Sequence, residues 1–233
     1  MRSSVVVTTV NYGGCDLLVH SLAHQTMPID DYEVIVVDEF YEQRKGLLPS
    51  PPFVHLPPKI KTDIHDNASG WNTAIAAARG ELVCFLIDYC WVYPDWLRDH
   101  WEFYHRNPGW SMSGYFDRYQ YPPMEEPPIE NLFSMFEEWF TDEYAQKYFA
   151  ANEPLYCERK GGAGIMQHDG KIEMPGEKIY LVNDSIPMKV LRKLNGLDER
   201  LNGTYGIIDV DVGIRANLAG HRFCLNPQSV IAR

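Results

Sequence analysis

Four aspartates in this 233-residue chain stand where a carboxylate can serve a binding or catalytic site. Asp38 and Asp88 each end an apolar run of strand-forming residues, whereas Asp209 and Asp211 open a segment with helical spacing. A carboxylate at the end of a strand can accept hydrogen bonds from ligand N–H and hydroxyl groups, or hold Mg²⁺ through oxygen. A carboxylate at the start of a helix is well placed to take a proton from a hydroxyl group as a general base.

The elements that must position these acids alternate between strands and helices in the first half of the chain. The expected strands are Ser4–Val10, Tyr32–Asp38 and Leu82–Asp88, and the expected helices are Asp16–Gln25, Ser69–Ala78 and a third with Pro94 in its first turn. The strands are apolar through their middle, which is typical of parallel strands covered on both faces. The alternation therefore predicts an α/β fold with a mostly parallel central sheet flanked by helices.

The second half of the chain has a weaker pattern, which we interpret as part of the same domain. Residues 108–128 contain prolines and aromatic residues without a clear period, and the glycine-rich segment 158–178 predicts a mobile loop. Further expected elements are one or two helices within Ile129–Ala150, a short helix from Val190, a helix over Asp209–Ala219 and a strand over Arg222–Leu225.

Composition and charge disfavour several classes of protein. The chain carries 21 Lys and Arg residues against 32 Asp and Glu, and this net charge of −11 disfavours a broad basic surface for nucleic acid or anionic lipid. The longest uninterrupted apolar run, Leu82–Ile87, is far shorter than the roughly 20 residues of a membrane span. The 5 cysteines form no CxxC pair and are typical of reduced thiols, so we expect a cytoplasmic protein.

Three segments of the chain, in this order, resemble the family 2 glycosyltransferases of the GT-A fold. They read VVVTTVNYGGCDLLVHSLAHQTMPIDDYEVIVVDE, NASGWNTAIAAARGELVCFLIDYCWVYPDWL and LRKLNGLDERLNGTYGIIDVDVGIRANLAGHRF. The resemblance implies a single GT-A domain, with a Rossmann-like nucleotide-binding half over residues 1–104 and an acceptor-binding half over residues 105–233. It also implies transfer of a sugar from a nucleotide-sugar donor, with a UDP-sugar favoured, to an acceptor hydroxyl by inverting direct displacement.

The resemblance places the donor at the carboxyl ends of the first strands, as the general rule for open α/β sheets also does. Thr8, Thr9 and Val10 would line the base pocket, mainly through backbone groups. Asp38, with Glu39 after it, would contact the uracil or the ribose. The alternative for Asp38 is an acid that caps a neighbouring loop at the end of its strand.

Two positions near the donor depart from the family pattern. Trp71 stands before Asn72, where the family usually has an arginine, and an indole can stack on a base but cannot neutralise a diphosphate. The alternative for Trp71 is core packing. Asp88 is the one carboxylate left in a turn that the family fills with Asp-x-Asp, although one aspartate and donor phosphates together can hold Mn²⁺ or Mg²⁺. The alternative for Asp88 is hydrogen bonding at the strand end.

The resemblance assigns the general base to Asp209, and we expect Asp211 to be an acceptor contact or a structural or secondary partner of that base. The helix N-terminus would lower the pKa of Asp209 and burial would raise it, and the alternative is an ordinary N-cap. Asn183 and Asp184 are expected contacts of the acceptor or donor sugar, with turn formation as the alternative. The 158–178 loop could close over the donor as a lid and supply the missing positive charge from Arg159, Lys160, His168 or Lys171, and the alternative is a plain disordered surface loop.

The acceptor class stays open among a glycan, a lipid-linked molecule, a protein and a nucleobase. Two other functions also remain. The departures at Trp71, at the turn of Asp88 and at Ile208 are compatible with an inactive relative that binds a nucleotide-sugar or a glycan. The basic residues of the 158–178 loop are compatible with a transferase that acts on hydroxylated bases in DNA.

Overall fold

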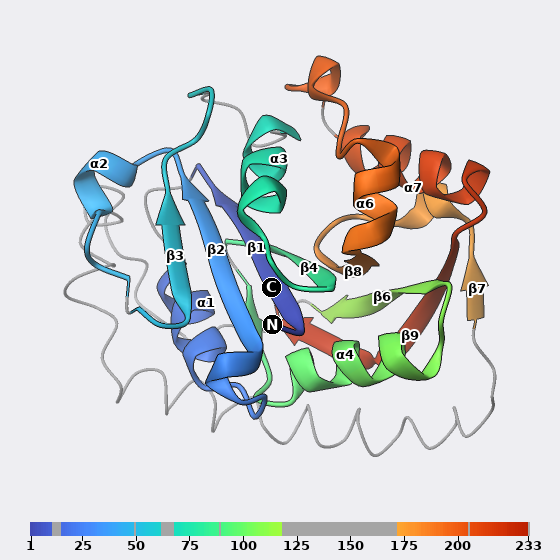
Figure 1. Cartoon of the computed structure of the whole chain (residues 1–233), viewed down its shortest axis with the longest axis horizontal. Coiled ribbons are helices and arrows are strands. Elements are labelled where there is room, and N and C mark those ends of the chain that lie inside the picture. The colour runs from blue at the N-terminus through green and yellow to red at the C-terminus, as the bar shows by residue number, and fades with distance from the viewer. Residues whose placement is uncertain are drawn as a thin grey trace.

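The computed structural model of this chain describes residues 1–10, 15–48, 50–61, 68–88, 90–117, 172–204 and 206–232. Within these residues the strands form one nine-stranded sheet, in the order β3-β2-β1-β4-β8-β6-β9-β5 with β7 paired to β9 (Figure 1). The strands are β1 (Ser3–Thr9), β2 (Tyr32–Asp38), β3 (Phe53–Leu56), β4 (Leu82–Ile87), β5 (Trp91–Val92), β6 (Trp110–Asp117), β7 (Ile172–Met174), β8 (Asn183–Pro187) and β9 (Arg222–Ala232). The helices are α1 (Cys15–Ala23), α2 (Tyr41–Arg44), α3 (Ala68–Ala77), α4 (Trp96–Arg106), α6 (Met188–Leu194) and α7 (Ile208–Leu218), with 3-10 helices η1 (Ile29–Asp31), η5 (Gly176–Lys178) and η6 (Glu199–Leu201).

The first half of the sheet is parallel, and the predicted α/β fold is confirmed. Strand β1 lies between β2 and β4 and pairs in parallel with both, while β3 pairs in parallel with β2. The predicted strands match β1, β2 and β4 to within one residue at each end. The register sets Thr9 beside Asp38 and Thr8 beside Ile87, so the carboxyl ends of the three strands lie side by side.

Strand β8 runs against its neighbours in the middle of the sheet, and the sequence pattern did not predict it. It pairs antiparallel with β4 and with β6. Turn formation at Asn183 and Asp184 was the alternative from sequence, and it is wrong because both are strand residues with 2% of their surface exposed. The segment NDSIP carries residue types that favour turns, so propensity alone does not reveal this strand.

Two hydrophobic cores cover the two faces of the sheet. One includes Val6 and Phe85 and packs against α3, α6 and α7; the other includes Val7 and Leu86 and packs against α1 and α4. Successive residues of a strand point to opposite faces, so each β-strand supplies both cores. Figure 1 shows α6 and α7 side by side on the same side of the sheet as α3.

The end of the predicted mobile loop is ordered secondary structure. Residues 172–178 form β7 and η5, and the turn of η5 packs on α7 where Gly176 and Gly213 meet. A Cβ atom on either glycine would overlap the carbonyl oxygen of the other, so only glycine fits there. The helix expected within Ile129–Ala150 and the loop cations Arg159, Lys160, His168 and Lys171 lie outside the described residues. Residues 110–117, which showed no clear period, form β6.

Candidate active site

A row of polar side chains crosses the carboxyl ends of the parallel strands on the face covered by α1 and α4. Thr9 ends β1 two residues after the core residue Val7, so it shares that face, and its hydroxyl donates to Asp88 Oδ2 at 2.7 Å. Asp38 lies beside Thr9 across the β1–β2 pair, and His55 of β3 contacts Asp38 in turn. The predicted donor residues Thr9, Asp38 and Asp88 are therefore brought together at one edge of the sheet.

Asp38 is the centre of a buried charged cluster that closes its own loop. Arg44 Nη1 donates to both carboxylate oxygens at 3.3 and 3.5 Å, and the Phe40 backbone N–H donates to Oδ1 at 2.8 Å. His55 Nε2 lies 3.1 Å from Oδ2. Asp38 and Arg44 expose only 2% and 4% of their side chains. The loop-capping alternative therefore describes the contacts of Asp38, and Glu39 adds a backbone hydrogen bond to Thr9 at 3.1 Å.

Arg44 and His55 are members of this cluster that sequence reasoning missed. Arg44 lies in the four-residue helix α2, and its guanidinium also stacks on the Phe40 ring with a centroid distance of 5.1 Å. His55 packs edge-on against the Tyr41 ring at 4.9 Å. Neither residue stands in a spacing that marks a site, because the contacts join segments that approach only when β2 and β3 pair.

Asp88 provides a single buried carboxylate at the place of the expected metal. It exposes 3% of its surface and accepts the Thr9 hydroxyl. Among the described residues, no group of three or more His, Cys, Asp or Glu side chains is arranged to hold a metal ion. A divalent ion beside Asp88 would need most of its ligands from donor phosphates and water. The described residues therefore do not build a metal site by themselves.

Trp71 and Asn72 hold the structure together on the other face of the sheet. Trp71 exposes 7% of its surface and packs edge-on against Phe85 at a centroid distance of 5.4 Å, which is the core-packing alternative. Asn72 makes a pair of hydrogen bonds to the backbone of Leu197, accepting from N at 2.8 Å and donating to O at 2.9 Å. Its Nδ2 also donates to Glu199 at 3.1 Å.

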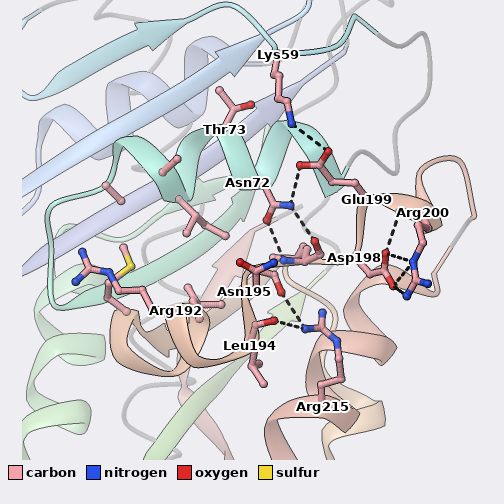
Figure 2. Close-up of a pocket in the computed structure, with 17 residues that line it drawn as sticks. Lys59, Asn72, Thr73, Arg192, Leu194, Asn195, Asp198, Glu199, Arg200 and Arg215 are labelled. Atoms are coloured by element: carbon pink, nitrogen blue, oxygen red, sulfur yellow. Dashed lines mark hydrogen bonds and ion pairs between the residues drawn. The ribbon is translucent and has the colours of Figure 1, made fainter.

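Figure 2 shows that the turn of residues 195–199 is fixed from two helices. Asn72 reaches it from α3, and Arg215 reaches it from α7 by donating to the carbonyl oxygens of Leu194 and Gly196 at 3.0 Å each. Asp211 accepts from Arg215 Nε at 2.7 Å and so orients that guanidinium. Asp211 is therefore a structural partner in the observed contacts, because it orients the guanidinium that holds this turn against α7.

Asp209 lies in the first turn of α7 and is partly exposed. The N-cap of α7 is Ile207, so the N-cap alternative for Asp209 is wrong. Its carboxylate accepts the Val210 backbone N–H at 2.9 Å, as expected for an acid at a helix N-terminus. A partly exposed carboxylate in this position has the access that a general base requires.

Asn183 and Asp184 are neighbours in β8 that face opposite sides of the sheet. Asn183 Oδ1 accepts from Trp96 Nε1 at 2.8 Å and lies 3.0 Å from His100 Nε2, so it faces α4. Asp184 pairs with Phe85 and Ser113 in the register and shares the face of α7. The structure thus brings Asp184, and not Asn183, to the side of the sheet on which Asp209 lies.

The electrostatic surroundings of Asp184 are unusual for a carboxyl group. The pKa of Asp184 is raised to about 6, chiefly by burial and to a lesser extent by the charge of Asp209, while the Ser113 hydroxyl and the backbone N–H groups of Val182 and Tyr180 lower it. Its Oδ2 accepts from Val182 N at 3.3 Å. Among the described residues, Oδ1 has no hydrogen-bond partner.

A groove of about 1100 Å³ lies between α3 and the segment of α6 and η6. Its walls include the apolar residues Ile75, Met188 and Leu191 and the rim residue Lys59 (Figure 2). Asn72 is the one predicted site residue on its lining, and Thr9, Asp38, Asp88 and Asp209 are not part of it. This groove is therefore a separate feature from the polar row at the strand ends.

Solved structures of glycosyltransferases share this fold. The structure of residues 1–349 of S. aureus TarS matches with a TM-score of 0.63 at 17% identity, covering 100% of this chain and 60% of that chain. The mannosyltransferase PcManGT from Pyrobaculum calidifontis, in complex with GDP-Man and Mn²⁺, matches with a TM-score of 0.62 at 15% identity, covering 100% and 56%. TarS 1–349 is also known in complex with UDP-GlcNAc and with UDP. The fold is therefore that of the GT-A glycosyltransferases.

Sequence comparison identifies the family within this class. The model described as glycosyl transferase family 2 matches residues 4–160, which is more than half of the chain. The chain belongs to glycosyl transferase family 2. No curated protein sequence matches it. In the described part of the chain, no helix has the length and apolar character needed to cross a membrane.

Proposed function

We propose that this protein transfers a sugar from a UDP-sugar to an acceptor hydroxyl, and that it does so with inversion. The observation that carries the proposal is the polar row of Thr9, Asp38 and Asp88 at the carboxyl ends of three adjacent parallel strands. Ligands of open α/β sheets bind at that edge. The neighbours that bind UDP, UDP-GlcNAc or GDP-Man support a nucleotide-sugar as the donor.

The donor half of the proposed single domain is residues 1–104. Thr8, Thr9 and Val10 end or follow β1 and offer backbone groups to the base. Asp38 and Glu39 lie at the same strand ends. Arg44 and His55 contact the two carboxylate oxygens of Asp38, so Asp38 can bind a nucleotide only if one of these contacts is broken. Asp38 therefore contributes to the pocket chiefly by holding Arg44 and the loop after β2.

Asp88 is the proposed contact of the donor ribose or diphosphate. Mn²⁺ or Mg²⁺, when bound with the donor, would neutralise diphosphate charge in the leaving group. Asp88 is the described residue placed to meet such an ion. Since Asp88 is one carboxylate, metal affinity should be weak without donor and should rise when donor phosphates complete the ligand set.

Asp209 is the proposed general base in the acceptor half, residues 105–233. It lies on the α7 side of the sheet, opposite the face of Thr9 and Asp38, so the proposal requires the donor sugar to extend across the strand ends toward α7. Asp209 takes the proton of the acceptor hydroxyl while the hydroxyl oxygen forms a bond to the anomeric carbon. The bond from that carbon to the diphosphate breaks, and its electron pair leaves with the nucleoside diphosphate. Most of the rate should come from positioning and charge stabilisation. Asp184 lies on the same side of the sheet as Asp209. The proposed acceptor is a molecule with a free hydroxyl group.

A second candidate function is nucleotide-sugar binding without transfer. The core position of Trp71 supports it, because this indole leaves the diphosphate without the cation that the family usually supplies. The single carboxylate at Asp88 supports it as well.

The reduced, buried thiols of Cys84, Cys90 and Cys224 support a reducing compartment for either function, and we propose that this compartment is the cytoplasm.

The first test is calorimetric titration of UDP, UDP-GlcNAc and GDP with and without Mn²⁺. Wild type should bind a uridine nucleotide, and Asp88→Asn should lose at least tenfold in affinity with Mn²⁺ present. Glu173→Gln is the control, because Glu173 forms an exposed ion pair with Arg222 on β9, away from the polar row. No nucleotide binding by wild type would contradict the proposal.

The second test separates transfer from binding. Release of UDP from a UDP-sugar, followed in the presence of a panel of hydroxyl acceptors, should occur with wild type and fall at least a hundredfold with Asp209→Asn. The same variant should keep its UDP affinity. Nucleotide binding without any donor turnover would favour the second candidate function.

A further inference from the structure

Asp184 is a buried carboxyl group on which no cation acts among the described residues. It exposes 2% of its surface, and its strand neighbour Ile186 on the same face belongs to the hydrophobic core with Ile208 and Val212 of α7. Its Oδ1 has no hydrogen-bond partner among the described residues. A charged group in such surroundings costs several kcal/mol, in general terms, unless it is paired.

The groups around Asp184 come from four described elements. Strand β4 contributes Phe85, β6 contributes the Ser113 hydroxyl, the segment before β8 contributes the N–H groups of Tyr180 and Val182, and α7 contributes the carboxylate of Asp209. Asp209 is the one charged side chain among the described residues that acts on Asp184. The interaction is between two acids, and electrostatic coupling of this kind is reciprocal.

A negative neighbour would raise the proton affinity of Asp209 and so make it a better general base. Asp209 lies in the first turn of α7, where the helix dipole stabilises the ionised carboxylate and so weakens it as a base. A general base works best when its proton affinity is close to the operating pH. A fixed negative charge nearby opposes the helix dipole, and a buried one does so more strongly than an exposed one because solvent screens it less.

We infer that Asp184 is a positioning residue whose buried charge makes Asp209 an effective acceptor for the proton of the acceptor hydroxyl. The inference rests on the proposed role of Asp209 as the general base. The proton moves from the acceptor oxygen to Asp209, and Asp184 forms no bond to the substrate. Burial keeps Asp184 out of contact with the acceptor, which replaces the contact role expected from sequence by an action through Asp209.

Carbon-detected NMR of the aspartate side-chain carboxyl groups tests the pair directly, with no substrate. Asp184→Asn keeps the shape and removes the charge, so the titration midpoint of Asp209 should fall by at least about half a pH unit, a threefold change in its dissociation constant. Glu33→Gln is the matched control. Glu33 is also a buried acid of the sheet, but it lies near the amino-terminal end of β2 and pairs with Ser4 and Arg79. This variant should leave the Asp209 midpoint unchanged.

Two further variants keep the inference falsifiable if Asp184→Asn does not fold. Asp209→Asn should lower the titration midpoint of Asp184, because the coupling is reciprocal. Ser113→Ala removes a group that favours the ionised form of Asp184, so it should raise the Asp184 midpoint and lower that of Asp209 between pH 5 and 7. Midpoints that do not respond to any of these changes would overturn the inference.

The pH profile of donor turnover then links the pair to catalysis. Asp184→Asn should move the acidic limb of the profile to lower pH and lower its plateau, whereas a variant with a merely structural defect would lower the whole profile in proportion. If no turnover is found with any acceptor, the proposed function fails while the NMR result on the pair stands. Turnover with a wild-type profile in Asp184→Asn would overturn only the inference about Asp184.

Discussion

The charged cluster at Asp38 provides the sharpest test of whether this residue is structural or binds the nucleotide directly. The change is Asp38→Asn, which keeps the size of the side chain and an oxygen for the Phe40 N–H, but removes the charge opposite Arg44. With the two side chains 2% and 4% exposed, water cannot replace the lost partner. Leaving one charge of a buried pair uncompensated typically costs about 3–5 kcal/mol.

The geometry places the expected loss at the lower end of this range. The Arg44 contacts, at 3.3 and 3.5 Å, are longer than the 2.7–2.9 Å typical of charge-assisted hydrogen bonds. The new amide nitrogen takes the place of Oδ2 and can donate to His55 Nε2 when the ring carries its proton on Nδ1. We therefore expect Asp38→Asn to reduce the free energy of unfolding by about 3 kcal/mol.

Urea unfolding followed by tryptophan fluorescence measures this loss, and Glu42→Gln is the matched control. Glu42 pairs with Lys45 on the exposed side of the same short helix, so its loss should leave the midpoint unchanged. The double variant Asp38→Asn/Arg44→Met should recover part of the loss, because it removes both charges of the buried pair. An unchanged midpoint in Asp38→Asn, combined with lost UDP affinity, would refute the structural assignment and restore direct nucleotide contact.

Three further changes test other parts of the structure. Gly213→Ala should lower the thermal midpoint, with a loss of about 1–3 kcal/mol, because its methyl group overlaps the Gly176 carbonyl; an unchanged midpoint would mean that η5 and α7 are not in contact. Asn72→Ala should cost about 1–3 kcal/mol and speed hydrogen exchange at the Leu197 amide, which loses its acceptor. The pKa of Asp184, raised to about 6 from 3.8, means that the folded state keeps a proton which the unfolded state loses between those values. The contribution of Asp184 to stability should therefore fall as the pH rises from 3.8 to 6, and Asp184→Asn should be more stable than wild type at pH 7 by up to about 3 kcal/mol, measured by urea unfolding of both proteins at pH 4 and pH 7.

The first half of the fold could be predicted because its local signals agree with its tertiary structure. The apolar runs of β1, β2 and β4 are buried on both faces, and this is the arrangement that such runs indicate. Strand β8 could not be predicted in this way. Its polar residues are satisfied by partners far away in the sequence, such as Trp96 for Asn183, and those partners are known only once the sheet has formed.

The sequence predicted which residues lie together at the strand ends better than it predicted where their side chains point. Thr9, Asp38 and Asp88 do meet at one edge, because parallel strands must end together. Sequence patterns do not show that Asp38 turns toward Arg44, since that contact depends on a four-residue helix without a periodic signal. Trp71 is a similar case, because an indole in the first turn of a helix is compatible with both stacking on a ligand and packing in a core.

Asn183 and Asp184 are adjacent in the sequence, but the geometry of β8 gives them different roles. Once β8 is known, alternation sends Asn183 toward α4 and Asp184 toward α7, so the two residues cannot serve one acceptor in the same way. Asn183 satisfies two ring donors and stabilises the packing of α4. Asp184 instead lowers the stability of the folded state, because a buried carboxylate is disfavoured once it is ionised above pH 6. A residue that lowers stability beside a partly exposed acid at a helix start is better explained by an effect on that acid than by packing.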